Sequence, residues 1–164
     1  MKISKRGEYA LRALIDLGMA KEAGRELLQA HEIASKEHIP IKFLEQILVQ
    51  LRGGGFIGTR RGKHGGYFLA RPLDAISIGQ LVRLIDGPLA PIACVSQTAY
   101  ERCSCPDEDH CGLRMLMLDV RNAIANILDR YTLLDVVDVT TRKLKRDNLP
   151  LPFASEDEPV RTRG

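Results

Sequence analysis

The chain has 164 residues, of which 45% are hydrophobic, enough for one domain or for a small domain with an accessory element. No run of 18 uncharged apolar residues is present, which excludes a transmembrane helix. Glu8, Arg12 and Asp16 interrupt the first apolar segment, which excludes a signal peptide. A cytoplasmic protein is therefore expected. Residues 1–72 carry 13 Lys/Arg against 7 Asp/Glu, whereas the remainder carries 11 against 14, so the N-terminal part favours a polyanionic partner.

The N-terminal part predicts a helix-turn-helix. Ser4 precedes an apolar pattern of helical period and is suited to cap the first helix. Residues 27–38 predict a second, short helix, which Pro40 ends. Pro40 is also well placed to begin a third helix over residues 40–52, and two short helices joined by a tight turn are typical of this motif.

A glycine-rich segment after the third helix predicts a β-hairpin. Residues 56–60 and 67–70 are β-type runs joined by RGKHGG, and a helix-turn-helix followed by a basic hairpin is a winged helix. Duplex DNA is the expected partner, because the third helix and the hairpin present polar and cationic side chains, and a two-fold dimer of such units would bind a pseudo-palindromic operator. The candidate DNA-binding residues are Lys42, Glu45 and Gln46 on the helix and Arg60, Arg61, Lys63 and His64 on the hairpin.

Regular apolar periodicity returns in the C-terminal half. Residues 77–86 predict a short amphipathic helix capped by Ser77, and residues 132–144 predict another helix. Between them, the pattern that begins at Leu113 is too apolar on one side for the remaining chain to cover, which predicts an isologous homodimer; packing on its own winged helix is the alternative. The candidate dimerisation residues are Leu113, Met117, Val120, Ile124, Ile127 and Leu128.

All four cysteines lie in one irregular stretch, residues 94–111, with the spacing C-x8-C-x-C-x5-C. Structural zinc sites usually use C-x2-4-C pairs, whereas iron–sulfur clusters accept less regular spacings and an occasional His. The pattern leaves an iron–sulfur cluster, a zinc site, a reduced thiol switch and inert cysteines as alternatives. The candidate metal ligands are Cys94, Cys103, Cys105, Cys111 and His110.

The whole layout resembles the Rrf-type winged-helix transcriptional regulators of bacteria, over about 140 residues from the N-terminus. The motifs that carry the resemblance are ISKRGEYALRALIDL, IPIKFLEQILVQLRGGGFI, RRGKHGGYFLARP and ISIGQLVRLIDGP. The resemblance implies a dimeric DNA-binding regulator and, for cluster-bearing members, a cluster that is usually 2Fe–2S, held by three loop cysteines and a variable fourth ligand.

Transferred to this chain, the resemblance implies that Cys94, Cys111 and either Cys103 or Cys105 bind the cluster. The extra thiol of the C-x-C pair departs from the family pattern. The fourth ligand would be His110 or Glu8, since Glu8 occupies the position in helix one where some members offer a carboxylate across the dimer; an ordinary solvent-facing role for Glu8 is the alternative.

The expected fold class is mainly α with a small β-hairpin wing. No nucleophile–base pair or phosphate loop is present, so the chain is not expected to be an enzyme; a metal- or cluster-binding accessory protein is the alternative to a regulator. The expected organisation is a DNA-binding domain over 1–72, a linker helix over 73–91, a cysteine loop over 92–111, the dimerisation and C-terminal helices over 112–145, and a disordered tail over 146–164.

Overall fold

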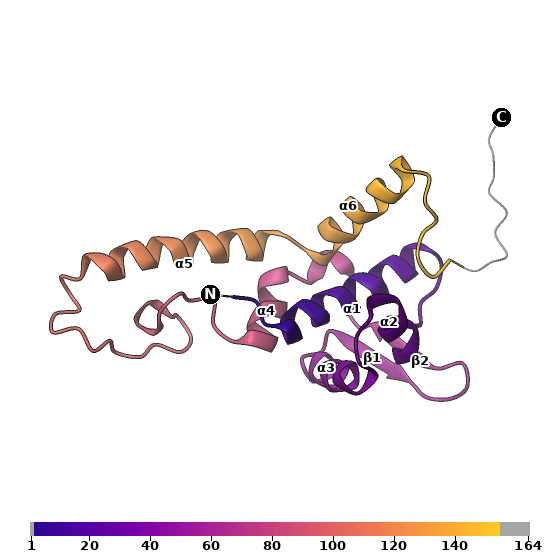
Figure 1. Ribbon diagram of the computed structural model, residues 1–164, viewed down its shortest axis with the longest axis horizontal. Coiled ribbons are helices and arrows are strands. Elements are labelled where there is room, and N and C mark those ends of the chain that lie inside the picture. Colours follow the sequence, from indigo (N-terminus) through magenta and orange to yellow (C-terminus); the bar gives the residue numbers. More distant parts are fainter. Residues whose placement is uncertain (1, 155–164) are drawn as a thin grey trace.

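The structure is a computed structural model that describes residues 2–154, and its elements form a winged-helix body from which one long helix extends (Figure 1). The helices are α1 (Lys5–Glu22), α2 (Ala30–Glu37), α3 (Ile41–Gly53), α4 (Ile78–Asp86), α5 (Gly112–Arg130) and α6 (Leu133–Arg146). The strands are β1 (Ile57–Arg60) and β2 (Gly66–Leu69), and two 3-10 turns are η1 (Leu73–Ala75) and η2 (Ala93–Val95). The prediction of a mainly α fold with a hairpin wing is confirmed.

Helix α1 is the centre of the body. Its N-terminus is capped as predicted, because the Ser4 hydroxyl accepts a hydrogen bond from the Gly7 amide at 3.0 Å. Its buried side, which includes Ala13, Leu14 and Leu17, packs in a core shared with α2, α3, α4 and α6. Burial of this apolar surface is the main force that holds the helices together.

The helix-turn-helix is formed by α2 and α3, but α2 begins three residues later than the sequence suggested. Gln29 occupies the N-cap position, where its backbone N–H donates to Glu32 Oε2 at 2.8 Å, so residues 27–29 lie outside the helix. Helix α2 ends at His38, which adopts the left-handed conformation (φ 54°). Pro40 is the N-cap residue of α3, so the predicted turn before α3 is present.

The wing is anchored on both edges of β2. On one edge β2 pairs antiparallel with β1, with Ile57 opposite Leu69 and Arg60 opposite Gly66. On the other edge the Leu28 amide donates to the Tyr67 carbonyl at 3.1 Å, and the Tyr67 amide donates to the Leu28 carbonyl at 2.8 Å. The segment predicted as the start of α2 therefore serves as a third, one-residue strand that fixes the wing to the helices.

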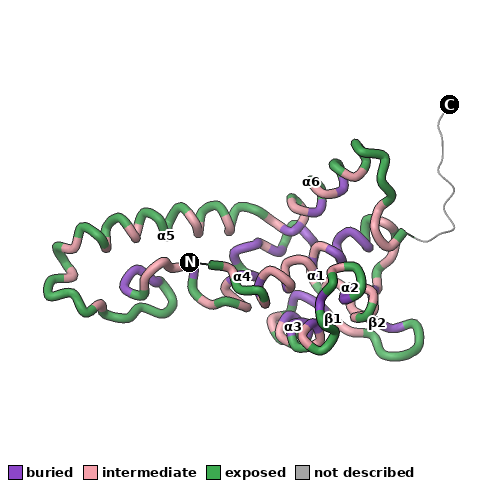
Figure 2. Tube along the Cα trace, in the orientation of Figure 1, coloured by how far each residue is buried: buried purple, intermediate pink, exposed green. Residues whose placement is uncertain are grey.

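The chain leaves the winged-helix body through α4 and α5 and returns to it with α6. Ser77 caps α4 as predicted, since its hydroxyl accepts from the Gln80 amide at 3.2 Å. Helix α5 lies beside the cysteine loop, and most of its length is exposed or half-buried (Figures 1 and 2). Helix α6 returns to α1, where Leu133 and Val137 are fully buried in the common core.

Two further predictions concern a transmembrane helix and the C-terminal tail. Within residues 2–154, no helix has the length and apolar character needed to cross a bilayer. Of the predicted disordered tail, residues 155–164 lie outside the described part of the chain, but Arg146 belongs to α6 and residues 147–154 are described, so the predicted start of the tail is wrong. In the part that is described, Phe153 is half-buried and contacts Lys36, whose ammonium lies 5.6 Å from the centre of the ring.

Candidate nucleic-acid interface and cysteine site

Helix α3 presents a polar face to solvent because its other face is committed to the core. Leu44, Ile47, Leu48 and Leu51 are completely buried. On the opposite side, Lys42 is exposed over 89% of its side chain and lies 3.7 Å from Glu45, and Gln46 is exposed as well. These three predicted residues form one accessible face with both hydrogen-bond donors and acceptors.

Gln50 lies at the border of the polar face of α3. It is half-buried and ties α3 to two other elements. Its side-chain amide donates to the Leu84 carbonyl of α4 at 2.9 Å, and its oxygen accepts from Arg6 Nε of α1 at 3.0 Å. A polar side chain at the border of a helix face can satisfy its hydrogen bonds inside the fold, which the periodicity alone does not reveal.

The tip of the wing places four predicted side chains in solvent: Arg60, Arg61, Lys63 and His64. Next to the tip, a groove of about 330 Å³ separates the wing from the start of α2. Gln29, the N-cap residue of α2, and His31 of α2 line this groove together with Lys63 and His64, and Gln29 Nε2 donates to the Lys63 carbonyl at 3.4 Å. Sequence reasoning missed Gln29 and His31 because it treated them as interior residues of a longer helix.

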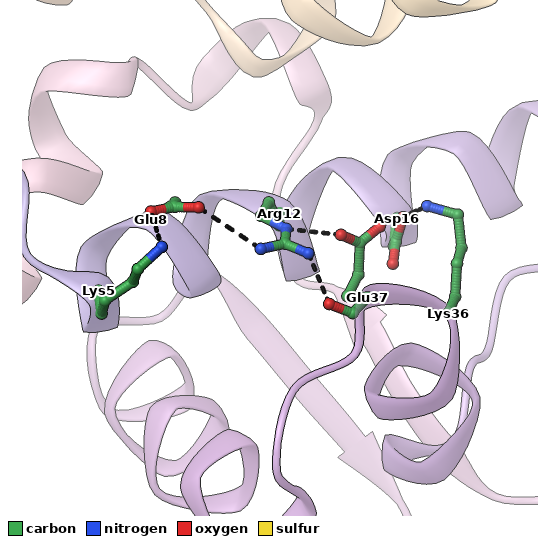
Figure 3. A network of polar contacts seen from close by, with 6 residues as sticks. All are labelled: Lys5, Glu8, Arg12, Asp16, Lys36 and Glu37. Atoms are coloured by element: carbon green, nitrogen blue, oxygen red, sulfur yellow. Dashed lines mark hydrogen bonds and ion pairs between the residues drawn. The ribbon is translucent and has the colours of Figure 1, made fainter.

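Figure 3 shows a chain of ion pairs that fixes α2 against α1. Arg12 Nε binds Glu37 at 2.6 Å, and Lys36 Nζ binds both Glu37 and the buried Asp16 at 2.5 Å. Burial raises the pKa of Asp16 to about 7, although the hydrogen bond from Lys36 acts in the opposite direction. The network holds the second helix of the motif in place without contributing directly to the exposed face of α3.

Glu8 lies at the beginning of this network. It is bound at 3.0 Å to Lys5 and at 3.5 Å to Arg12, and its side chain is 45% exposed. Within the protomer it is therefore a solvent-facing helix residue in an ion-paired row.

The cysteine loop brings all four thiols to one cavity. Cys94, Cys103, Cys105 and Cys111 line a cavity of about 200 Å³ beside the start of α5. Arg114 of α5 holds both ends of the loop, because its Nε donates to the Cys94 carbonyl at 3.3 Å and lies 3.3 Å from Glu108 Oε1. Cys94 is buried, whereas Cys105 is exposed.

Their surroundings raise the pKa values of two of the four thiols. Hydrogen bonding and charge interaction with Cys103, reinforced by Cys111, raise the pKa of Cys105 to about 11, and burial raises the pKa of Cys94. Cys103 Sγ donates to Glu108 at 3.8 Å, and Cys111 Sγ accepts from the Arg114 amide at 3.4 Å as the N-cap of α5. His110 points elsewhere: its Nδ1 lies 2.7 Å from Asp107, and it does not line the cavity.

The donor set of the cavity fits an iron–sulfur cluster in chemical type. Thiolates are the ligands that such clusters use, and four sulfur atoms converge on one space from both ends of the loop. In residues 2–154, however, no three His, Cys, Asp or Glu side chains are close enough to form a metal-binding group. Binding would therefore require the loop to tighten around its occupant.

Together, the capped three-helix core, the exposed face of α3 and the basic wing define a winged-helix DNA-binding protein. Residues 3–139 match the Rrf2 family, which is described as iron-dependent transcriptional regulators, and the chain belongs to this family. It is a bacterial transcriptional regulator and not an enzyme, and regulators of this family bind DNA and are typically dimers.

Individual relatives and structures agree with this assignment. An rrf2-like HTH-type regulator of Rhodobacter capsulatus is 41% identical over 82% of this chain and 91% of its own. The structure of CymR, the global cysteine regulator of B. subtilis, is 31% identical with a TM-score of 0.71 over 85% of this chain and 98% of its own. The structure of IscR from T. potens is 25% identical with a TM-score of 0.67 over 87% and 90%.

Proposed function

We propose that this regulator is a homodimer that binds a pseudo-palindromic operator, and that an iron–sulfur cluster in the cysteine loop controls its affinity for DNA. The observation that carries the proposal is the convergence of all four thiols on one cavity beside α5, the helix that leaves the winged-helix body. The loop thereby joins a candidate sensing site to the element that would set the distance between two DNA-binding units.

The DNA-binding part of the proposal rests on the exposed face of α3 and on the wing. Lys42, Glu45 and Gln46 would contact base edges in the major groove, where their donors and acceptors can distinguish base pairs. Arg60, Arg61, Lys63 and His64 on the wing would contact phosphates or the minor groove.

Arg61→Ala tests the wing. Without this guanidinium, one phosphate is no longer neutralised, so operator binding should weaken and the slope of log affinity against log salt should fall by about 1. Arg142→Ala, which removes an exposed arginine of α6 instead, is the matched control and should leave affinity and slope unchanged. Equal slopes for wild type and Arg61→Ala would remove this side chain from the interface.

The dimer part rests on one apolar face of α5. Leu113, Leu116 and Ile127 are each more than half exposed and Val120 is 37% exposed, whereas Leu128 packs on the protomer's own core. Of the predicted seam, Leu113, Val120 and Ile127 are the strongest candidates for contact with a second copy, and Met117 and Ile124 border this face.

Val120→Glu places a carboxylate in the middle of that face. Analytical ultracentrifugation should show a monomer, because an unpaired charge buried in the seam costs on the order of several kcal/mol. Asn122→Glu adds the same charge to the opposite, exposed side of α5 and should remain a dimer. A dimeric Val120→Glu variant would mean that the two copies meet elsewhere.

Cys94, Cys111 and one of Cys103 and Cys105 would hold the cluster, and a fourth ligand of another type would complete its shell. For that position His110 would have to leave Asp107 and turn toward the cavity, and Glu8 would have to come from the second copy. When bound, a 2Fe–2S cluster supplies a redox-active centre whose potential depends on its ligands and their hydrogen bonds.

Control of DNA binding would follow from the position of the loop between α4 and α5. Arg83 of α4 forms a bidentate ion pair with Asp129 of α5, at 2.5 and 2.9 Å, and the loop spans the other end of α5. A loop that is tightened around a cluster and a loop that is free would favour different angles between α5 and the body. The spacing of the two recognition helices, which must match half-sites about one helical turn apart, would change with that angle.

Purification without oxygen, followed by absorption spectroscopy and iron, sulfide and zinc analysis, tests the cofactor. Wild type should show a visible chromophore with iron and sulfide. Cys94→Ala and Cys111→Ala should abolish it, whereas only one of Cys103→Ala and Cys105→Ala should do so. A chromophore that survives Cys94→Ala would contradict the assigned ligand set.

A regulator without a cluster is the second candidate, and it is favoured because Cys103, Cys105 and Cys111 line one cavity where they could bind zinc or pair as a disulfide. Such a protein would use the same cavity for zinc or for reversible thiol oxidation. A colourless wild type with stoichiometric zinc would support the zinc-containing form. A colourless, metal-free protein whose DNA affinity changes reversibly with oxidant and reductant would support the thiol form.

A further inference from the structure

Arg121 of α5 is a buried cation without a carboxylate partner in residues 2–154. Its side chain faces its own protomer, where the residue retains only 8% of its exposure, and its Nε has no hydrogen-bond partner in that part of the chain. The ion pairs that α5 forms there involve Arg114 and Asp129 and not Arg121. Because buried charges in proteins are normally paired, this guanidinium is suited to bind a compensating group.

Arg121 lines a small cavity between α4, the segment after it, and α5. The residues that line the cavity are Arg83, Pro88, Leu89, Ser96, Gln97, Thr98, Arg121 and Ala125. Leu89 and Ser96 are buried, whereas Gln97 and Thr98 are exposed at the rim, so that a small solute has access from solvent.

The polar groups of this cavity are arranged to donate. The Ser96 hydroxyl oxygen accepts from the Ala99 amide at 3.0 Å, which leaves the hydroxyl proton free for another acceptor. The charge of Arg83 is compensated by its bidentate pair with Asp129, so the uncompensated positive charge is that of Arg121. A small anion can accept the hydrogen bond of Ser96 and also compensate the charge of Arg121. A neutral water molecule can accept the hydrogen bond but does not compensate the charge.

We propose that this cavity binds a single chloride-sized anion between Arg121 and Ser96. The space available to the centre of a water-sized occupant is about 20 Å³. Because about 10–15 Å³ is enough for one water molecule, the cavity has room for one small ion. The site shares no lining residue with the cysteine cavity or the DNA-binding face, although Ser96, Gln97 and Thr98 belong to the cysteine loop.

The bound anion would strengthen the joint between α4 and α5. An ion that binds only the folded protein raises its stability by an amount set by its concentration relative to its Kd. Transfer from sodium gluconate to sodium chloride at equal ionic strength should therefore raise the Tm of the full-length protein by roughly 3–6 °C. Arg121→Met should lose this shift, and Arg130→Met, which removes an exposed arginine of the same helix, should keep it.

Crystals of the wild-type protein grown in sodium bromide give a direct test that does not depend on how well Arg121→Met folds. Anomalous density for one bromide next to Arg121 is the expected result. A peak assigned to water, with no anomalous signal, would overturn the proposal. A chloride-dependent Tm shift of equal size in wild type and Arg121→Met would also overturn it, because the shift would then reflect a general salt effect.

Discussion

Replacing Asp16 by Asn should make the stability of this protein less dependent on pH between about 4 and 8, because it removes a buried carboxyl that retains its proton in the folded state. Asp16 is 1% exposed, and its Oδ1 accepts from Lys36 Nζ at 2.5 Å. Its second oxygen, Oδ2, has no partner within residues 2–154. One hydrogen-bonded oxygen does not offset the cost of burying the charge, which is why burial raises its pKa to about 7.

The size and sign of the effect follow from this pKa. In the unfolded chain the carboxyl loses its proton near pH 3.8, and in the folded protein it does so near 7. Between these values the folded state binds more protons, so the contribution of Asp16 to stability is complete below pH 3.8 and is lost as pH rises through 7. A difference of about three pKa units corresponds to roughly 4 kcal/mol, which is an upper value because the neighbouring Glu37 carboxyl titrates with Asp16.

Urea unfolding of wild type and Asp16→Asn at pH 4.5, 6 and 8, at one protomer concentration, measures the effect. All other carboxyls occur in both proteins, so the difference in unfolding free energy isolates residue 16. The variant should gain stability relative to wild type as pH rises, whereas removal of the bond to Lys36 adds a constant offset because Lys36 stays charged and still binds Glu37 at 2.5 Å. A difference that is constant across this range would show that Asp16 is ionised throughout and would refute the reasoning.

Three further substitutions test the packing of the body. Leu14→Ala, at a completely buried position, should lower the free energy of unfolding by about 3 kcal/mol in a urea titration. Thr132→Ala should cost about 1 kcal/mol in the same measurement, because it removes the cap that Thr132 and Asp135 form at the start of α6. Gly18→Ala should be destabilising because a Cβ at Gly18 would come within 2.7 Å of Val137, and a double-mutant cycle with Val137→Ala should recover part of the loss.

Local signals were sufficient for most of the fold. Ser4 and Ser77 are polar residues directly before apolar helical patterns, and both cap their helices as predicted. The sequence-based start of α2 was wrong because Leu28 continues the apolar pattern of the helix, while its actual role is to pair with Tyr67. A contact between residues so distant in the chain leaves no periodic trace in either segment.

For the candidate site, the sequence predicted which residues take part better than how they are arranged. The clustering of the cysteines indicated a common site, and all four line one cavity. The apolar pattern of α5 did not show that Leu128 packs on the body while Val120 faces solvent, because both residues fit the same broad stripe. Asp16 and Arg121 are single charges in helical patterns, and only the packing around them reveals that they are buried.

The return of α6 to α1 has a consequence for how the protein is made. Leu133 and Val137 belong to the same core as Ala10 and Ala13, so this core is complete only after the chain has been synthesised past α5. Domains generally fold as units during synthesis, and here the last part of the unit follows the helix with the exposed apolar face. A nascent chain is therefore expected to complete its core and to expose the apolar face proposed for a second copy at the same stage of translation.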